Sequence, residues 1–213
     1  MEERKAPVLC TPETDSTNLA LRRLAADGAA DGTVFWAARQ SAGRGRLGRS
    51  FASPEGGLYY SMLLDAAQEP ARDLLLSDRK LCGILAEGFT VGARRCLALG
   101  IGINVNTERF PPELESVAVS LRQILGRETD LPALARALTE ELDQAVAAAR
   151  RGDGALLADY RARCLTVGRR VTLLQNGGGR EAFALGVNDD FSLAVRLADG
   201  SEESVLSGEV SIR

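Results

Sequence analysis

Three short apolar runs constrain the fold of this 213-residue chain more than any other feature of its sequence. They are GLYYSMLL at 57–64, CGILAE at 82–87 and RCLALGIGINV at 95–105, and each has the length of a β-strand. A fourth strand is predicted at 33–39, TVFWAAR. Because neighbouring positions in these runs are apolar, both faces of the strands must be buried. The sequence therefore predicts a sheet that is covered by helices.

Helices are predicted in three places. The first begins near Ser16 or Thr17, whose hydroxyls can cap it, and continues to Gly28. The clearest helical pattern covers 130–151, with an Asp cap, a Pro in the first turn and two Arg at the end. A shorter helix is predicted at 154–164. The apolar face of the 130–151 helix would consist of Leu134, Ala135, Leu138, Leu142 and Val146.

The C-terminal tail, 166–213, has a different pattern. About five brief strands are separated by turn signals at 176–179, 188–190 and 198–201. This spacing predicts a small, SH3-like β-barrel. The sequence thus favours an α+β chain with a mixed sheet covered by helices at 1–165 and a separate β domain at 166–213.

Composition and charge limit the classes of function that this chain can have. Hydrophobic residues make up 45% and charged residues 26% of the chain, which fits a globular protein with a sizeable core. The net charge of -3 offers no general attraction to nucleic acid. No run reaches the roughly 18 apolar residues that a membrane span needs, and the N-terminus has no leader pattern. We therefore expect a cytoplasmic protein that contacts neither membrane nor nucleic acid.

The chain contains no histidine, which excludes Ser-His-Asp and Cys-His catalysis and His-ligated metals. Its four cysteines form no CxxC pair, so they match neither a zinc site nor a disulfide framework. They are expected to be free and mostly buried. No metal ligands are predicted, and any chemistry must use Lys, Arg, carboxylates or backbone amides.

The loop RQSAGRGRLGR at 39–49 is the strongest functional signal. Its glycines allow the backbone to approach a ligand closely, and its arginines offer forked donors for carboxylate or phosphate. These properties predict a clamp for an anion. Flexible nucleic-acid-binding segments also contain Gly-Arg runs, so RNA binding is an alternative interpretation of the loop alone.

Four motifs occur in the order found in biotin protein ligases: DSTN at 15–18, the loop at 39–49, KLCGILAE at 80–87 and GIGINVN at 100–106. The chain resembles this family from about Val8 to Arg213, and the β tail is similar too. The resemblance implies a class II synthetase-like biotin/lipoate ligase core. The winged-helix repressor module of the family is not seen in this sequence, so no DNA-binding role is expected.

The activity implied by the resemblance has two steps. Biotin and ATP give biotinoyl-5'-AMP and pyrophosphate, and the biotinoyl group then passes to a lysine on the biotin carrier domain of a carboxylase. ATP chemistry implies Mg²⁺ as well. The resemblance also suggests a homodimer.

The resemblance implies a set of site residues. Catalytic roles fall to Arg44, Arg46 and Lys80. The adenylate would contact Arg46, Arg49, Gly100 and Asn104. For Ser16 and Thr17, helix capping is an alternative or additional role, and for Ile84, Leu85 and Ile101 core packing is equally plausible. Biotin would be bound by Ser16, Thr17, Asn18, Gln40, Gly43, Arg44, Gly45, Arg46, Gly83, Ile84 and Leu85.

The chain departs from the family pattern in one segment. Family members have a Lys-Trp-Pro-Asn-Asp motif shortly before the position of Lys80, and its lysine contacts carboxylate and phosphate. This motif is missing here, and an ungapped reading places Glu69 at the lysine position. Only 65–81 separates two predicted strands, whereas a helical crossover with its strands needs roughly 30 residues. A helix and a strand near 65–76 are therefore expected to be missing. Either the given sequence omits residues that the native protein has, which the join AQEPARD-LLLSDRK favours, or the native protein has a true deletion.

A true deletion would expose apolar surface worth about 25 cal/mol per Å² and weaken the fold. Adenylation would also slow, since one lost electrostatic donor can cost ~10²–10³ in rate. Two alternatives to a biotin protein ligase remain. One is a lipoate ligase, and the other, consistent with the missing lysine, is a module that binds biotin without catalysis.

Overall fold

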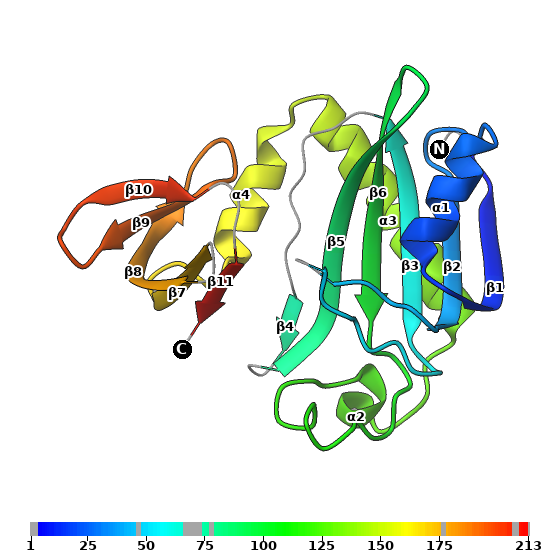
Figure 1. Ribbon diagram of the computed structural model, residues 1–213, viewed down its shortest axis with the longest axis horizontal. Coiled ribbons are helices and arrows are strands. Elements are labelled where there is room, and N and C mark those ends of the chain that lie inside the picture. Colours follow the sequence, from blue (N-terminus) through cyan, green and yellow to red (C-terminus); the bar gives the residue numbers. More distant parts are fainter. Residues whose placement is uncertain are drawn as a thin grey trace. The chain divides into compact units, whose positions relative to one another are not determined.

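The computed structural model describes residues 4–45, 48–65, 74–76, 79–175, 178–205 and 209–212 (Figure 1). The chain forms two compact units, Met1–Asp143 and Gln144–Arg213. The boundary between the units falls inside a long helix. The predicted assignment of a ligase domain to 1–165 and a β domain to 166–213 stays a prediction.

The first unit is built on a six-stranded sheet with the order β1-β2-β3-β6-β5-β4. β1 and β2 run parallel, and the other neighbouring pairs are antiparallel, so the predicted mixed sheet is confirmed. The strands are β1 (Val8–Thr14), β2 (Val34–Gln40), β3 (Leu58–Asp65), β4 (Leu74–Leu76), β5 (Arg79–Val91) and β6 (Arg94–Ile103).

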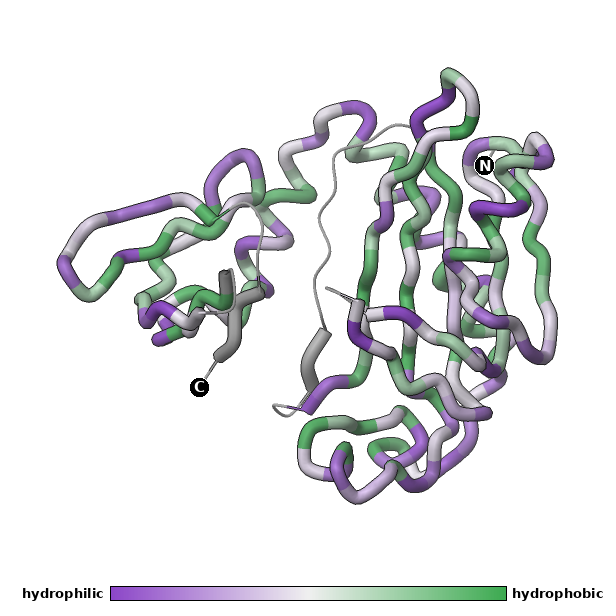
Figure 2. Tube along the Cα trace, viewed as in Figure 1, coloured by the Kyte–Doolittle hydropathy of each residue, from purple (hydrophilic) through white to green (hydrophobic). Residues whose placement is uncertain are grey.

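β3 lies inside the sheet and is buried on both faces, as its apolar run predicts. Figure 2 shows the hydrophobic positions gathered along β3 and its neighbours. On one face, helix α1 (Thr17–Ala26) contacts β2, β3, β5 and β6, and Leu21 packs against Leu63. On the other face, the Tyr60 hydroxyl lies 2.9 Å from Thr139 Oγ1 in helix α3 (Leu131–Arg150). Helices therefore cover both faces, as expected.

Helices α1 and α3 lie where they were predicted, but the N-cap of α1 and the buried face of α3 differ from the prediction. Ser16 is the N-cap residue of α1 by backbone conformation, but its side chain makes no capping hydrogen bond. Ser16, Thr17 and Asn18 are instead buried. In α3 the most buried positions are Ala135 and Thr139, and the other predicted face residues are half-buried.

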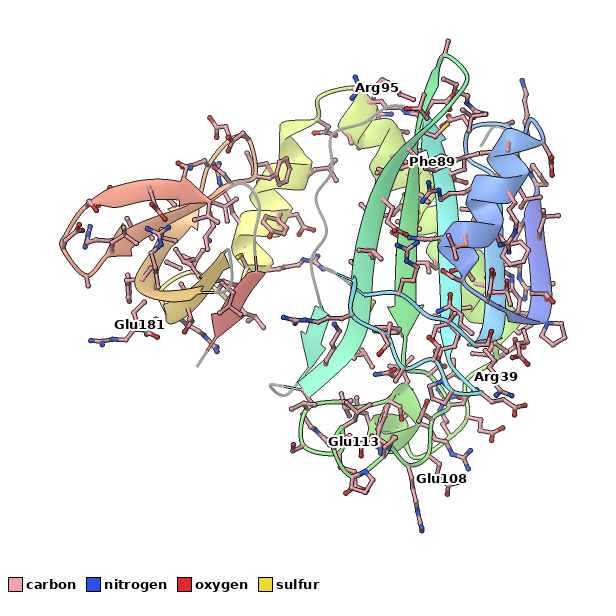
Figure 3. All side chains as sticks on the ribbon, in the orientation of Figure 1. Arg39, Phe89, Arg95, Glu108, Glu113 and Glu181 are labelled. Atoms are coloured by element: carbon pink, nitrogen blue, oxygen red, sulfur yellow. The ribbon has the colours of Figure 1, made fainter. Side chains whose placement is uncertain are left out.

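Three features of the first unit were not predicted. β1 is an edge strand with mostly exposed residues, so its sequence lacks an apolar period. Helix α2 (Leu121–Leu125) has only five residues, and a Ser120–Gln123 capping box starts it. β5 extends beyond the apolar run as far as Val91, because it pairs with β6 up to the hairpin turn at Gly92. Phe89, labelled in Figure 3, lies on this extension, where the Arg22 guanidinium stacks 5.2 Å from its ring centroid.

The interval between β3 and β5 contains the short strand β4, in which Leu74 pairs with Cys82 of β5. This is the interval from which a helix and a strand were expected to be missing. The rest of it, 66–73 and 77–78 with Glu69, lies outside the described residues.

The second unit contains helix α4 (Gly154–Arg163) and a five-stranded antiparallel sheet with the order β10-β9-β8-β7-β11. Val171, Leu173 and Val195 are among its core residues, and Leu157 and Tyr160 of α4 pack against them. The predicted set of about five short strands is confirmed, and closure into an SH3-like barrel stays a prediction. The strands are β7 (Arg170–Gln175), β8 (Gly178–Val187), β9 (Leu193–Leu197), β10 (Glu202–Val205) and β11 (Glu209–Ile212).

All four cysteines are free, and Cys82 and Cys96 are buried. Across the part of the chain that the structure describes, no helix combines the length and apolarity needed to cross a bilayer.

Candidate functional site

Most of the predicted site residues that the structure describes gather on the α1 side of the first sheet. The floor consists of glycines on β5 and β6: Gly83 pairs with Gly102, and Gly100 lies two residues before Gly102. A Cβ on Gly100 would lie 2.5 Å from Asn18 Oδ1, and one on Gly102 would lie 2.6 Å from the ring of Phe51. Only glycine permits these close approaches, so the sheet brings Asn18 and Phe51 directly onto its backbone. We call this surface the glycine face.

Gln40 joins the first turn of α1 to the end of β2. Its Oε1 accepts from the Thr17 backbone N–H at 2.8 Å, and its Nε2 donates to Ser53 Oγ at 2.9 Å. Gly43 lies against the same Ser53 hydroxyl, with no room for a side chain. The amide of Gln40 is therefore oriented by protein partners at both ends.

A second polar group contains two residues that the sequence did not identify. Ser61 Oγ donates to Asn18 Oδ1 at 2.7 Å and lies equally close to the Thr17 hydroxyl. Asn18 Nδ2 donates to Glu87 Oε2 at 2.8 Å, and Glu87 Oε1 lies 3.4 Å from the Arg44 guanidinium. The strand period could have indicated Glu87, since Gly83, Leu85 and Glu87 share one face of β5.

The same strand period separates the remaining predicted pocket residues. Leu85 is on the glycine face, and its carbonyl is 3.4 Å from Asn18 Nδ2. Ile84 pairs with Ile101 on the opposite face. The Ile84 side chain therefore points away from Asn18 and Arg44, which favours core packing for Ile84 and Ile101.

The anion loop is folded against the start of α1. The Ala42 N–H donates to the Asp15 carbonyl at 2.8 Å, and the Gly45 N–H donates to the Arg49 carbonyl at 2.7 Å. Arg44 also forms an isolated antiparallel bridge with Ser50. The structure thus brings Arg44 to the glycine face through Glu87, and Gly45 lies against Arg49 and Ser50, whereas Arg46 lies outside the described residues.

Lys80 and Asn104 form the opposite end of the site. Lys80 Nζ lies 5.6 Å from the centroid of the Phe51 ring, and a Cβ on Gly83 would lie 3.3 Å from this nitrogen. The Lys80 carbonyl accepts from Asn104 Nδ2 at 3.2 Å. Asn104 is buried, and its own carbonyl accepts from the Leu121 N–H of α2. Gly100, in contrast, lies beneath Asn18 rather than beside Asn104.

An ion pair supports the start of α1. Both oxygens of Asp15 accept from the Arg23 guanidinium at 2.8 Å, and Oδ1 also accepts from the Ser16 N–H. The hydrogen bonds from Arg23 hold the pKa of Asp15 well below its usual range. The Asp15 carboxylate therefore anchors the Ser16 backbone at the start of α1, next to Thr17 and Asn18.

Comparison with known proteins agrees with this architecture. The family model described as the Biotin/lipoate A/B protein ligase family matches residues 10–72. The Biotin--[acetyl-CoA-carboxylase] ligase of Mycobacterium tuberculosis is 34% identical over 202 residues, which cover 78% of this chain and 74% of that protein. The Bifunctional ligase/repressor BirA of Escherichia coli is 30% identical, with 97% of this chain and 74% of that protein covered.

A solved structure is similar to this chain over nearly its whole length. The biotin protein ligase from Aquifex aeolicus in complex with biotin and ATP has a TM-score of 0.81 and 25% identity, and the match covers 97% of this chain and 98% of that one. The fold, the order of the motifs and the curated relatives all agree with the resemblance read from the sequence. The chain belongs to the biotin protein ligase family.

Proposed function

We propose that this protein is an ATP-dependent biotin protein ligase. The observation that carries the proposal is the glycine face, in a fold shared with a ligase solved with biotin and ATP. Here Glu87 links Asn18 of α1 to Arg44 of the loop, and Gln40 of β2 accepts from the adjacent residue of α1, Thr17. The family model includes lipoate ligases, but the Mycobacterium tuberculosis relative and the Aquifex aeolicus structure are both named as biotin ligases. This favours biotin over lipoate as the substrate.

The first step is attack of a biotin carboxylate oxygen on the α-phosphorus of ATP. The new P–O bond gives biotinoyl-5'-AMP, and the bond to the β-phosphate breaks with its electron pair leaving on pyrophosphate. Both reactants are anions, so cationic donors must offset their repulsion. Arg44 and Lys80 lie at the two ends of the glycine face and can do this, and Arg46 is proposed to join them.

The Gly45 amide was also expected to hold the carboxylate. In the folded loop this N–H already donates to the Arg49 carbonyl at 2.7 Å. The loop must therefore rearrange around Arg49 before the Gly45 N–H can bind the biotin carboxylate. A loop that becomes ordered over the adenylate in this way would keep water from the reactive anhydride.

The biotin head is an uncharged urea that needs both donors and acceptors. Ser16, Thr17, Asn18 and Gln40 are neutral groups of this kind. Thr17 and Asn18 contact Ser61 on the α1 side of the face, and Gln40 accepts from the Thr17 backbone N–H. We place the urea here, and the carboxylate toward Arg44. Gly83 and Leu85 would form the adjoining wall.

The nucleotide is proposed to lie toward Asn104 and Lys80, with Arg49 near its phosphates. Among the described residues no three His, Cys, Asp or Glu side chains gather in a way that could hold a metal ion. We propose that Mg²⁺, where ATP is bound, would be held by the ATP phosphates.

In the second step, the amine of a carrier lysine attacks the acyl carbonyl, an amide bond forms, and AMP leaves with the electron pair of the broken C–O bond. We propose the biotin carrier domain of a carboxylase as this partner, by analogy with the acetyl-CoA-carboxylase ligase relatives. A homodimer and a cytoplasmic location stay predictions. The proposal includes neither DNA nor RNA as a partner, although some relatives are named as repressors.

The decisive experiment measures pyrophosphate release by the purified protein with ATP, with and without biotin. We expect release that depends on biotin, which would mean that Lys80 or another group serves in place of the missing motif lysine. Lipoate in place of biotin is the matched control, and equal release with either acid would contradict the biotin assignment. A folded protein that binds biotin but releases no pyrophosphate would be a binding module instead.

A further inference from the structure

Glu87 is a carboxylate on the glycine face that joins two separate parts of the site. Its Oε2 accepts from Asn18 Nδ2 at 2.8 Å, and its Oε1 lies 3.4 Å from the Arg44 guanidinium. The Glu87 side chain is 17% exposed, and that of Arg44 is 43% exposed. Glu87 therefore connects α1, whose first residues are proposed to bind the biotin urea, to the loop 39–49, whose Arg44 is proposed to bind the biotin carboxylate.

The location of Glu87 on β5 allows both contacts. Its partner across the ladder is Ala98 of β6, which adds only a methyl group to the same face. The longer Glu87 side chain can thus reach α1 and the anion loop without competition from its neighbour.

The carboxylate also determines which way Asn18 faces. An ionised carboxylate can only accept hydrogen bonds, so it selects the Nδ2 end of the Asn18 amide. The Oδ1 end then faces Ser61, whose hydroxyl donates to it at 2.7 Å. With Glu87 in place, one orientation of Asn18 satisfies both partners.

We propose that Glu87 is a positioning residue for biotin, which fixes the Arg44 guanidinium beside the glycine face where the biotin carboxylate binds. The inference rests on the proposed ligase function. Arg44 has five N–H donors in a planar fork, so one contact with Glu87 leaves others for a second carboxylate. Holding a long, half-exposed side chain in advance reduces the conformational entropy lost when biotin binds.

The test is Glu87→Gln, which has the same size and keeps one oxygen to accept from Asn18. Its amide nitrogen cannot accept from Arg44, so the variant removes one contact of the two. We expect the Kd for biotin, measured by calorimetry without ATP, to rise roughly 2- to 5-fold, as for the loss of a partly exposed ion pair. The KM for biotin should rise in parallel, with kcat and the KM for ATP changed less than about twofold, as expected for lost uniform binding.

The matched control is Glu202→Gln, which breaks another acid–arginine contact, with Arg196 at 2.9 Å, in the second unit. It should leave the Kd for biotin unchanged. Glu87→Asp keeps the charge but is one methylene shorter, so it should lie between the wild type and Glu87→Gln. Thermal unfolding of each variant shows whether the fold is retained.

A double-mutant cycle separates positioning through Arg44 from a general structural effect. In an Arg44→Gln background, Glu87→Gln should cause no further loss of biotin affinity. Additive losses, or an unchanged Kd in Glu87→Gln alone, would overturn the inference. Because biotin binding is measured directly, these outcomes are readable even if the wild type releases no pyrophosphate, a result that would count against the proposed function only.

Discussion

Gly100 shows how a single residue without a side chain shapes the site. The nearest atom to a Cβ placed on it is Asn18 Oδ1 at 2.5 Å, inside the group that also contains Ser61 and Glu87. Asn18 is buried and bonded at both ends, so it cannot move aside without breaking one of these bonds.

Gly100→Ala should therefore displace Asn18 and weaken biotin binding. Overpacking of this kind costs about 1–3 kcal/mol. If the same cost falls on binding, the Kd for biotin should rise about 5- to 150-fold, because 1.4 kcal/mol is tenfold in affinity. Calorimetry provides the measurement. The control is Gly154→Ala at the start of α4, where no atom lies within 4 Å of the added Cβ. Biotin affinity equal to wild type in Gly100→Ala would show that Asn18 is not part of the biotin site.

At the same scale, the sequence identified most site residues within motifs, but it missed Glu87 inside one motif and Ser61 outside all of them. Asn18, Gln40, Arg44 and Lys80 could be proposed because each lies in a recognisable motif. Ser61 could not, because its role depends on strand pairing that places it 2.7 Å from a helix residue 43 positions earlier in the chain. A local pattern contains no information about such a contact.

At the scale of elements, the contact between β3 and α3 includes one buried hydroxyl pair, Tyr60 and Thr139. Thr139 Oγ1 donates to the Ala135 carbonyl at 2.7 Å, so the Tyr60 hydroxyl must be the donor in the 2.9 Å bond between them. Burial is the main cause that raises the pKa of Tyr60 from 10.0 to about 12.

Tyr60→Phe should lower the free energy of unfolding by about 0.5–1.5 kcal/mol, because it removes one buried hydrogen bond and leaves Thr139 with its helix partner. Urea unfolding at neutral pH gives this value. The raised pKa adds a pH effect: the unfolded tyrosine loses its proton first, so the stabilising contribution is complete below pH 10 and is lost as the pH rises to about 12. Tyr60→Phe should show a shallower fall over this range, and an equal slope would contradict the assignment.

The sequence predicted elements well where the apolar pattern was strong. β2, β3, α1 and α3 lie where expected, within a few residues. β1 was missed because an exposed edge strand needs no apolar period, and α2 because five residues with a capping box are too short for a helical pattern. The end of β5 was placed too early, since its last residues are set by pairing with β6 rather than by burial.

At the scale of the whole molecule, each unit has its own core. Leu21 and Leu63 are fully buried in the first unit, and Val171 and Val195 in the second. All the described residues that we place at the biotin site belong to the first unit. The change of pattern near 166 indicated a second body from sequence alone, and its bounds at 166–213 stay a prediction. The two compact units divide inside α3, and α4 packs on the second sheet.

Val195→Ala tests this division. The side chain is 0% exposed, so its loss should destabilise the second core by roughly 2 kcal/mol. Hydrogen exchange should become faster in β7, β8 and β9, while β3 and the Kd for biotin stay as in the wild type. Leu63→Ala is the reciprocal control, with faster exchange in β3 and weaker biotin binding, because Leu63 packs against the helix that carries Asn18. If Val195→Ala weakened biotin binding as much as Leu63→Ala does, the second unit would be required for the biotin site, and assigning that site to residues of the first unit would be wrong.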